Sequence, residues 1–245
     1  MTMHQHLANA TFQVIAGTSC GSGFSFLRED LVITNFHVVK PLVDLQNSRI
    51  LGPATLITES GQNILAQIIH VDIQYDFAVM RISESLPPDR VVLQPCTNFT
   101  PSRGLRLIFA GYPHGFPQLL IGEAIVSSPL EDGKFSIDGM VNGGNSGGPI
   151  VNLETGNVVG IVTQRRYPGK DEADAIADQA KDLLRELANM QVNVRFGGVD
   201  FARINSLYAE SLATIVKLLE SNANPGIGIG FPIQPVIDAI LTRND

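Results

Sequence analysis

Two series of short apolar segments, each broken by turn residues, constrain the fold of this chain more than any other feature. The segments are rich in Val, Ile, Phe and Thr and partly alternate in polarity, which is typical of β-strands. The first series is Thr11–Gly17, Phe24–Arg28, Leu31–Asn35, Ala54–Thr58, Ile64–Val71 and Phe77–Ile82, and the second is Leu105–Ala110, Leu120–Ser127, Lys134–Ile137, Pro149–Asn152 and Val158–Gln164. Many short strands favour an all-β barrel or sandwich, and the proline- and glycine-containing join at Thr100–Gly104 favours two barrels.

A helical pattern interrupts the second series. From about Asp171 to Gln191 apolar residues recur every three or four positions, which predicts an amphipathic helix. Gly197-Gly198 breaks this pattern, and a second helical pattern runs from Phe201 to Leu219. We therefore expect a helical hairpin inserted between two strands of the second barrel.

Charge excludes some classes of partner. The net charge is −7 and the chain has no Lys/Arg cluster, so we expect neither nucleic acid nor an anionic membrane to be a partner. No apolar run approaches the roughly 20 residues that a membrane-spanning helix needs.

The N-terminus and the cysteines predict a cellular compartment. Met1–His6 has no basic region and leads into no long apolar segment, so it is not typical of a secretory signal. Only two cysteines, Cys20 and Cys96, are present; they could pair, but reduced thiols suit the cytoplasm. We expect a cytoplasmic protein.

A glycine-dense loop, Gly143-Gly144-Asn145-Ser146-Gly147-Gly148, carries a single hydroxyl immediately before an apolar strand. By itself this loop is also compatible with an ordinary glycine-rich turn. Upstream, however, His37 follows one predicted strand and Asp76 directly precedes another. A serine hydroxyl becomes a good nucleophile when a histidine takes its proton and a carboxylate orients that histidine. Asp72 is the rival carboxylate, although a surface turn suits it better.

Seven segments, in consistent order, resemble the trypsin-like (chymotrypsin-fold) serine proteases, and most of all those of HtrA/Deg type. They are Gly21–Phe24, Thr34–Val39, Asp76–Met80, Gly111–Pro113, Gly122–Ser127, Asp138–Pro149 and Gly228–Ile233. The resemblance implies a mainly β fold of two six-stranded antiparallel barrels, here with the helical hairpin inserted. The domain boundaries we expect are 1–98 for the first barrel, 99–169 for the first part of the second, 170–223 for the hairpin, and 224–245 for the closing strand and a terminal helix.

The resemblance also implies a role for particular residues. Ser146 is the expected nucleophile, His37 the general base and Asp76 the orienting carboxylate. The oxyanion hole falls on Gly144, Asn145 and Ser146, with the N–H groups of Gly144 and Ser146 as donors. No metal or other cofactor is implied. His4, His6, His70 and His114 lack a context comparable to that of His37.

The substrate pocket implied by the resemblance has Met140 at its base and Thr163, Gln164 and Gly228 in its walls. An apolar base predicts a small or medium aliphatic side chain before the scissile bond. Arg165 and Arg166 leave open the alternative that an acidic group is recognised.

Together these features predict a serine endopeptidase with a restricted protein or peptide substrate. We expect no PDZ domain after Asp245, so recruitment would depend on residues 170–223, which are either a decorative insertion or a docking or self-association surface. One alternative is a latent or inactive scaffold that acts through the inserted helices. Another is an esterase that uses the same site.

Overall fold

Residues 2–114, 116–165, 175–176, 178–179, 182–183, 185–186, 195–196, 199–222 and 226–242 are described by a computed structural model. The chain divides into two units. The first comprises Met1–Arg165 and Gly226–Asp245, and the second comprises Arg166–Pro225.

The first barrel of unit 1 is closed, with the strand order β1-β2-β3-β8-β7-β6. Its strands are β1 (Thr11–Ala16), β2 (Ser19–Phe26), β3 (Arg28–Thr34), β6 (Ala54–Ile57), β7 (Asn63–Asp72) and β8 (Phe77–Ile82), all paired antiparallel. Strand β7 shows why the sequence folds this way: Ile64, Ala66 and Ile68 are buried, whereas the residues between them are exposed. This two-residue period places one apolar face inside the barrel.

The second barrel is also closed, with the order β10-β11-β16-β13-β12-β9. Its strands are β9 (Arg106–Gly111), β10 (Leu120–Pro129), β11 (Phe135–Asp138), β12 (Pro149–Asn152), β13 (Val158–Arg165) and β16 (Ile227–Pro232). Strand β16 pairs with both β13 and β11, so the chain completes this barrel only after residues 166–225. The predicted fold class, two six-stranded antiparallel barrels, is confirmed.

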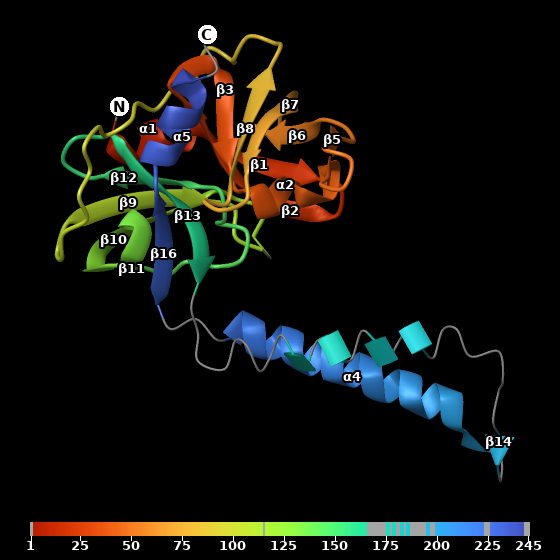
Figure 1. The fold of residues 1–245 in the computed structure, drawn as a ribbon. Helices are drawn as coiled ribbons and strands as arrows, with labels where there is room; N and C mark the ends of the chain where they lie inside the picture. The colour runs from red at the N-terminus through yellow and green to blue at the C-terminus, as the bar shows by residue number, and fades with distance from the viewer. Residues whose placement is uncertain are drawn as a thin grey trace. The chain divides into compact units, whose positions relative to one another are not determined.

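A buried apolar cluster joins the two barrels to two terminal helices, α1 (Met3–Ala10) and α5 (Gln234–Leu241). Leu7 of α1 and Val236 of α5 are fully buried in this cluster, together with Phe24 of the first barrel and Ile108 of the second. Figure 1 shows both helices beside the place where the barrels meet. The cluster therefore fixes one barrel against the other, which matters because each barrel contributes residues to the candidate site.

Short elements complete the first unit. Helix α2 (Phe36–Val39) and the 3-10 turn η1 (Lys40–Leu42) follow β3, and a small hairpin pairs β4 (Val43–Asp44) with β5 (Arg49–Ile50). The 3-10 turn η2 (Glu131–Gly133) precedes β11.

The glycine-containing segment Gly21–Phe24 lies within strand β2, although its resemblance to the trypsin-like family implies a turn there. Its glycines are required by close packing rather than by a turn. A side chain on Gly21 would collide with Val38, and one on Gly23 would meet the backbone oxygen of Ile33. The absence of side chains at these two glycines thus lets the backbone of β2 pack closely against neighbouring residues of the first barrel.

In the second unit, α4 (Phe201–Asn222) forms where the second helical pattern lies. A small hairpin, in which β14 (Arg195–Phe196) pairs with β15 (Val199–Asp200), precedes this helix. The Asp200 carboxylate accepts the backbone N–H of Arg203 at 3.1 Å, which satisfies a donor at the start of the helix. Most of the first predicted helix, Asp171–Gln191, lies outside the described residues. Those of its positions that are described are helical. No helix in the described part of the chain is long and apolar enough to cross a membrane.

Candidate active site

His37 and Asp76 form a tightly paired dyad at one end of the first barrel. His37 lies on α2, just after β3, and Asp76 immediately precedes β8, which pairs with β3. One carboxylate oxygen of Asp76 lies 2.7 Å from His37 Nδ1, and the other accepts the His37 backbone N–H at 3.0 Å. Because an ionised carboxylate only accepts hydrogen bonds, the proton belongs on Nδ1. This leaves the lone pair of Nε2 available to take a proton.

The backbone of Asp76 adopts an uncommon conformation that turns its carboxylate toward the dyad. Its φ is +48°, in the left-handed region that Asp and Asn tolerate better than most residues. Two groups bind the Asp76 carbonyl: the Phe36 N–H at 3.2 Å and Asn35 Nδ2 at 2.6 Å. Asp72, the rival carboxylate, accepts the Tyr75 N–H at 2.8 Å in the preceding turn.

A hydrogen-bond network links the dyad to Ser146. Asn35 is completely buried, and its Nδ2 donates both to the Asp76 carbonyl and to Thr163 Oγ1 on β13, at 3.2 Å. The carbonyl of the same Thr163 accepts the Ser146 hydroxyl at 3.2 Å. Among the described residues the Ser146 hydroxyl donates to this carbonyl rather than to His37. The three residues predicted for catalysis thus share one network across the two barrels.

The backbone of the glycine-rich loop leaves two N–H groups without an acceptor. Its carbonyl groups accept hydrogen bonds from His114 N at Gly143, Ser22 Oγ at Gly144, Gly148 N at Asn145 and Ser22 N at Ser146. The N–H of Asn145 donates to Asn142 O, and that of Gly147 donates to Val162 O. In the described part of the chain, no acceptor binds the N–H of Gly144 or of Ser146. These are the two donors that an oxyanion hole requires.

Asn145 contributes differently from the rest of the predicted oxyanion hole. Its N–H already donates within the loop, at 3.1 Å. Its side chain is only 3% exposed, and its Oδ1 lacks a partner among the described residues. The geometry therefore leaves Gly144 and Ser146 as the available pair.

Glycine is needed at Gly147 for both conformational and steric reasons. Its φ is +87°, and a Cβ there would collide with the Ser22 carbonyl oxygen and the Thr34 hydroxyl. We expect Gly147→Ala to be destabilising in urea unfolding by ~1–2 kcal/mol for the left-handed backbone and a further ~1–3 kcal/mol for the collision.

Gly61→Ala is the matched control for Gly147→Ala, because Gly61 has φ +84° but nothing within 4 Å of the added Cβ. It should show the backbone cost alone. Equal losses for the two variants would mean that the loop does not pack against β2 as described.

The predicted pocket residues lie in several environments. Met140 is 64% exposed, whereas Thr163 is 2% exposed and belongs to the network above. Gly228 lies on β16, where a side chain would collide with Val141. The N–H of Gly139 donates to Gly226 O at 2.8 Å, which holds the Met140 segment beside the start of β16. Gln164 belongs to β13, and Arg166 lies outside the described residues.

The remaining histidines lie in separate environments. His4 and His6 lie on α1, and His4 Nε2 is 3.7 Å from Glu123 Oε1. His70 lies beside Phe77, with a ring-centroid separation of 5.7 Å. The described residues contain no cluster of three or more His, Cys, Asp or Glu side chains that would hold a metal ion.

His114 contacts the nucleophile loop, which the sequence did not indicate. Its backbone N–H donates to Gly143 O at 2.6 Å, and its Nε2 lies 3.2 Å from the carbonyl oxygen of Cys20. A side chain on Gly143 or Gly144 would meet the imidazole. His114 therefore lies beside these two glycines and links them to the first barrel.

Both cysteines are unpaired thiols. Burial raises the pKa of the Cys20 thiol above its ordinary value, partly offset by a hydrogen bond from Gln13. Because the thiolate is the reactive form, we expect Cys20 in a Cys96→Ser background to react more slowly with iodoacetamide at pH 8 than the same thiol in urea-unfolded protein. Mass spectrometry of the modified protein over time measures both rates, and equal rates would contradict the assigned burial.

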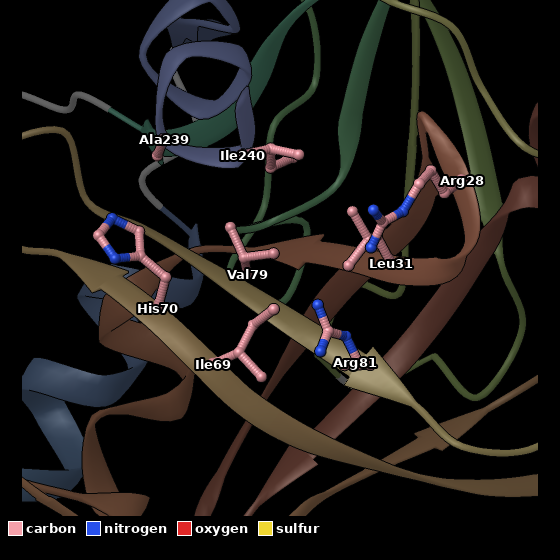
Figure 2. Close-up of a pocket in the computed structure, with 8 residues that line it drawn as sticks. All are labelled: Arg28, Leu31, Ile69, His70, Val79, Arg81, Ala239 and Ile240. Carbon is pink, nitrogen blue, oxygen red and sulfur yellow. The ribbon is translucent and has the colours of Figure 1, made fainter. Parts of the chain in front are cut away.

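A cavity of about 280 Å³ lies away from the dyad, among β3, β7, β8 and α5 (Figure 2). Its lining comprises Arg28, Leu31, Ile69, His70, Val79, Arg81, Ala239 and Ile240, and includes neither Ser146 nor His37 nor Asp76. Both of its arginines pair with Asp30, Arg28 Nε at 3.0 Å and Arg81 Nε at 3.3 Å. Much of the positive charge at its rim is therefore already neutralised within the protein.

Two closed barrels, a His–Asp dyad on the first and a serine in a glycine-rich loop of the second define the class of chymotrypsin-fold serine hydrolases. The family described as trypsin-like peptidase domain matches residues 21–161. The chain therefore belongs to the trypsin-like peptidase family.

Its relatives are serine proteases of HtrA type. The chain is 31% identical over 182 residues to serine protease HTRA1 of Xenopus tropicalis, covering 70% of this chain and 36% of the relative. It is 30% identical over 242 residues to a probable periplasmic serine endoprotease, DegP-like, of Rhizobium meliloti, covering 90% of this chain and 44% of the relative. The chain thus spans less than half the length of these two relatives.

A solved structure shares the fold. The HtrA-type protease AlgW with tripeptide superposes with a TM-score of 0.62 at 18% identity, covering 99% of this chain and 63% of AlgW. The resemblance to HtrA-type proteases predicted from the sequence is confirmed.

Proposed function

We propose that this chain is a serine endopeptidase that cleaves peptide bonds through an acyl-enzyme intermediate. The observation that carries the proposal is that the N–H groups of Gly144 and Ser146 have no acceptor among the described residues, while Ser146 shares a network with the His37–Asp76 dyad. Such donors stabilise the oxyanion that forms when a carbonyl carbon is attacked. Family membership supports the same chemistry.

In the first half of the reaction Ser146 Oγ bonds to the substrate carbonyl carbon while His37 Nε2 takes its proton. Collapse of the tetrahedral intermediate breaks the C–N bond, and His37 gives the proton to the leaving amine. Water then attacks the ester by the same route and restores Ser146. The resting hydroxyl must first leave Thr163 O, a neutral hydrogen bond worth about 0.5–1.5 kcal/mol.

The substrate preference that we propose is a small or medium aliphatic side chain before the scissile bond. Met140 and Ile227 are both exposed apolar residues, 64% and 44% exposed, in segments joined by the bond from Gly139 to Gly226. Met140, Thr163, Gln164 and Gly228 remain the predicted pocket. The acidic alternative depends on Arg165 and on Arg166, of which the second lies outside the described residues.

Peptide cleavage is the direct test of this function. A mixture of peptides with every residue at the position before the cleaved bond, incubated with the protein, should give products that end mainly in Val, Ala, Ile or Leu. Mass spectrometry identifies the cleavage sites, and a parallel ester substrate separates a peptidase from an esterase. Hydrolysis of esters with no peptide cleaved would contradict the proposal.

Helix α4 supports a second role in contacting other proteins. On α4 the side chains of Phe201, Ile204, Leu207, Tyr208 and Ile215 are each at least 45% exposed. Exposed apolar residues in such number are typical of a protein-binding face. We propose that this face binds a substrate or another copy of the chain. Such binding is also compatible with the alternative that the chain acts as a latent scaffold. Sedimentation of the wild type and of Leu207→Lys compares the oligomeric states of the two proteins.

A cytoplasmic location also remains a proposal. The unpaired Cys20 and Cys96 support it, whereas the Rhizobium meliloti relative is described as periplasmic. Fractionation of the source cells, with immunodetection of the chain, tests it.

A further inference from the structure

Ser22, on β2 of the first barrel, is bound to the nucleophile loop of the second barrel at two points. Its hydroxyl is 2.7 Å from Gly144 O, and its backbone N–H donates to Ser146 O at 2.8 Å. The residue is completely buried. Its own carbonyl accepts the Thr34 hydroxyl at 2.6 Å, which ties it to β3 just before the His37 segment.

The direction of the Ser22 hydroxyl bond is unambiguous. The backbone N–H of Tyr112 points at Ser22 Oγ from 2.9 Å, and an amide can only donate. The hydroxyl oxygen is therefore an acceptor for Tyr112, and its single proton is directed to Gly144 O. Ser22 has no rotational freedom left without breaking one of these two bonds.

This bond fixes the peptide between Gly144 and Asn145. The Gly144 carbonyl binds Ser22, and the Asn145 N–H on the other edge binds Asn142 O. Gly144 has φ +95°, and a residue without Cβ can adopt other backbone conformations at little cost. Without the hydroxyl, only the bond from the Asn145 N–H to Asn142 O would hold this peptide. The peptide could then turn and shift the residues on either side of Asn145, Gly144 and Ser146, whose N–H groups are the two candidate oxyanion donors.

We propose that Ser22 is a positioning residue for the oxyanion hole, and this inference rests on the proposed function. Its hydroxyl keeps the Gly144 carbonyl turned toward the first barrel, so that the N–H groups of Gly144 and Ser146 stay available to the substrate oxyanion. Ser22 itself does not contact the reacting atoms; it acts through Gly144. The first barrel thus contributes to the oxyanion hole as well as the His–Asp dyad.

The chain offers a close control for this proposal. Ser25 lies three positions further along β2 and is equally buried, but its hydroxyl lacks a hydrogen-bond partner among the described residues. Ser22→Ala and Ser25→Ala therefore each remove one buried hydroxyl from the same strand. Only the first removes a bond to the nucleophile loop.

Kinetics and inhibitor binding provide the first readout. Loss of an oxyanion donor costs about 10²–10³-fold in kcat, and a donor held less firmly should cost less. We expect Ser22→Ala to lower kcat by about 10–100-fold with KM nearly unchanged. A peptide boronate mimics the tetrahedral intermediate, and its affinity for the variant should fall by a similar factor. Ser25→Ala should change neither quantity. Ser22→Cys, with a weaker donor of similar shape, should give an intermediate loss.

Hydrogen exchange provides a readout that does not depend on activity. In wild type the N–H groups of Asn145 and Gly147 are bonded and should exchange slowly. Ser22→Ala should speed exchange in a peptide that covers residues 140–148, while urea unfolding shows whether the fold survives. If Ser22→Ala does not fold, Ser22→Cys takes its place in both measurements.

The outcomes separate this inference from the proposed function. An active wild type, with kcat, boronate affinity and loop exchange unchanged in Ser22→Ala, would overturn the positioning role alone. Equal losses in Ser22→Ala and Ser25→Ala would also overturn it, because they would reflect general damage to β2. If wild type cleaves no peptide but hydrogen exchange in residues 140–148 is still faster only in Ser22→Ala, the positioning of the loop by Ser22 is supported and the proposed function fails.

Discussion

Ser146→Ala is expected to lower kcat for peptide cleavage by about 10⁵–10⁶-fold, the scale seen when a serine nucleophile is removed from a triad. The substitution deletes the one atom that forms the acyl-enzyme in the proposed mechanism. In the folded state it removes only the bond from the hydroxyl to Thr163 O, so the free energy of unfolding should change by about 1 kcal/mol or less. Initial rates at saturating peptide, together with urea unfolding, measure both effects.

Ser136→Ala is the control for Ser146→Ala. The Ser136 hydroxyl also donates to a backbone carbonyl, that of Ser128, at 3.3 Å. Ser136→Ala should lower the free energy of unfolding by a similar, small amount and leave kcat unchanged. Retention of more than a hundredth of the wild-type kcat in Ser146→Ala would show that another residue is the nucleophile.

Asp76→Asn is expected to lower kcat by about 10⁴-fold at neutral pH, as in the equivalent change in a trypsin-like triad. Asp76 holds the proton on His37 Nδ1 through a 2.7 Å contact, and the other oxygen accepts the His37 N–H. An amide placed there can donate to Nδ1, which favours the tautomer with its proton on Nε2. That tautomer cannot accept a proton from Ser146.

The backbone should tolerate Asp76→Asn, because asparagine also adopts the left-handed conformation found at φ +48°. Asp72→Asn is the control, since this carboxylate accepts the Tyr75 N–H and does not contact His37. Comparable losses of kcat in the two variants would be inconsistent with a specific orienting role for Asp76. Steady-state kinetics at one pH, with unfolding curves for both variants, provide the comparison.

The barrels could be predicted because their strands carry a local signal. In β7, for example, the polar Asn63 and Gln67 alternate with the buried Ile64, Ala66 and Ile68, and the exposed Leu65 departs from this two-residue period. Helix α4 likewise begins at Phe201, where the three- and four-residue period starts. In both cases neighbours along the chain determine which face is apolar.

Elements that depend on distant contacts are predicted only in part or not at all. Strand β2 begins at Ser19, before the predicted strand Phe24–Arg28, and its glycines Gly21 and Gly23 lie close to Val38 and Ile33. Helix α1 is short, and its helical state depends on burying Leu7 against residues from both barrels. Neither contact has a signature in the local sequence.

The candidate site shows the same division between residues with a local sequence signal and residues whose role depends on distant contacts. His37, Asp76 and Ser146 could be predicted because each lies in a segment with recognisable neighbours, and the structure places them in one network. Asn35 and Ser22 also lie within such segments. Their roles arise from bonds that span 128 and 122 positions of the chain, from Asn35 to Thr163 and from Ser22 to Gly144. The sequence signals are limited to a polar residue between two glycines, for Ser22, and a polar residue two positions before the candidate histidine, for Asn35.

Labelling by a fluorophosphonate tests the central claim most directly, because this reagent forms a covalent bond only with a serine that has both an activating base and an oxyanion hole. We predict one phosphonyl group per wild-type chain, mapped by mass spectrometry to Ser146, and none in Ser146→Ala. His37→Ala should react far more slowly than wild type. A folded wild-type protein that stays unlabelled, or that is labelled at another residue, would contradict the proposal that this site is an assembled serine protease.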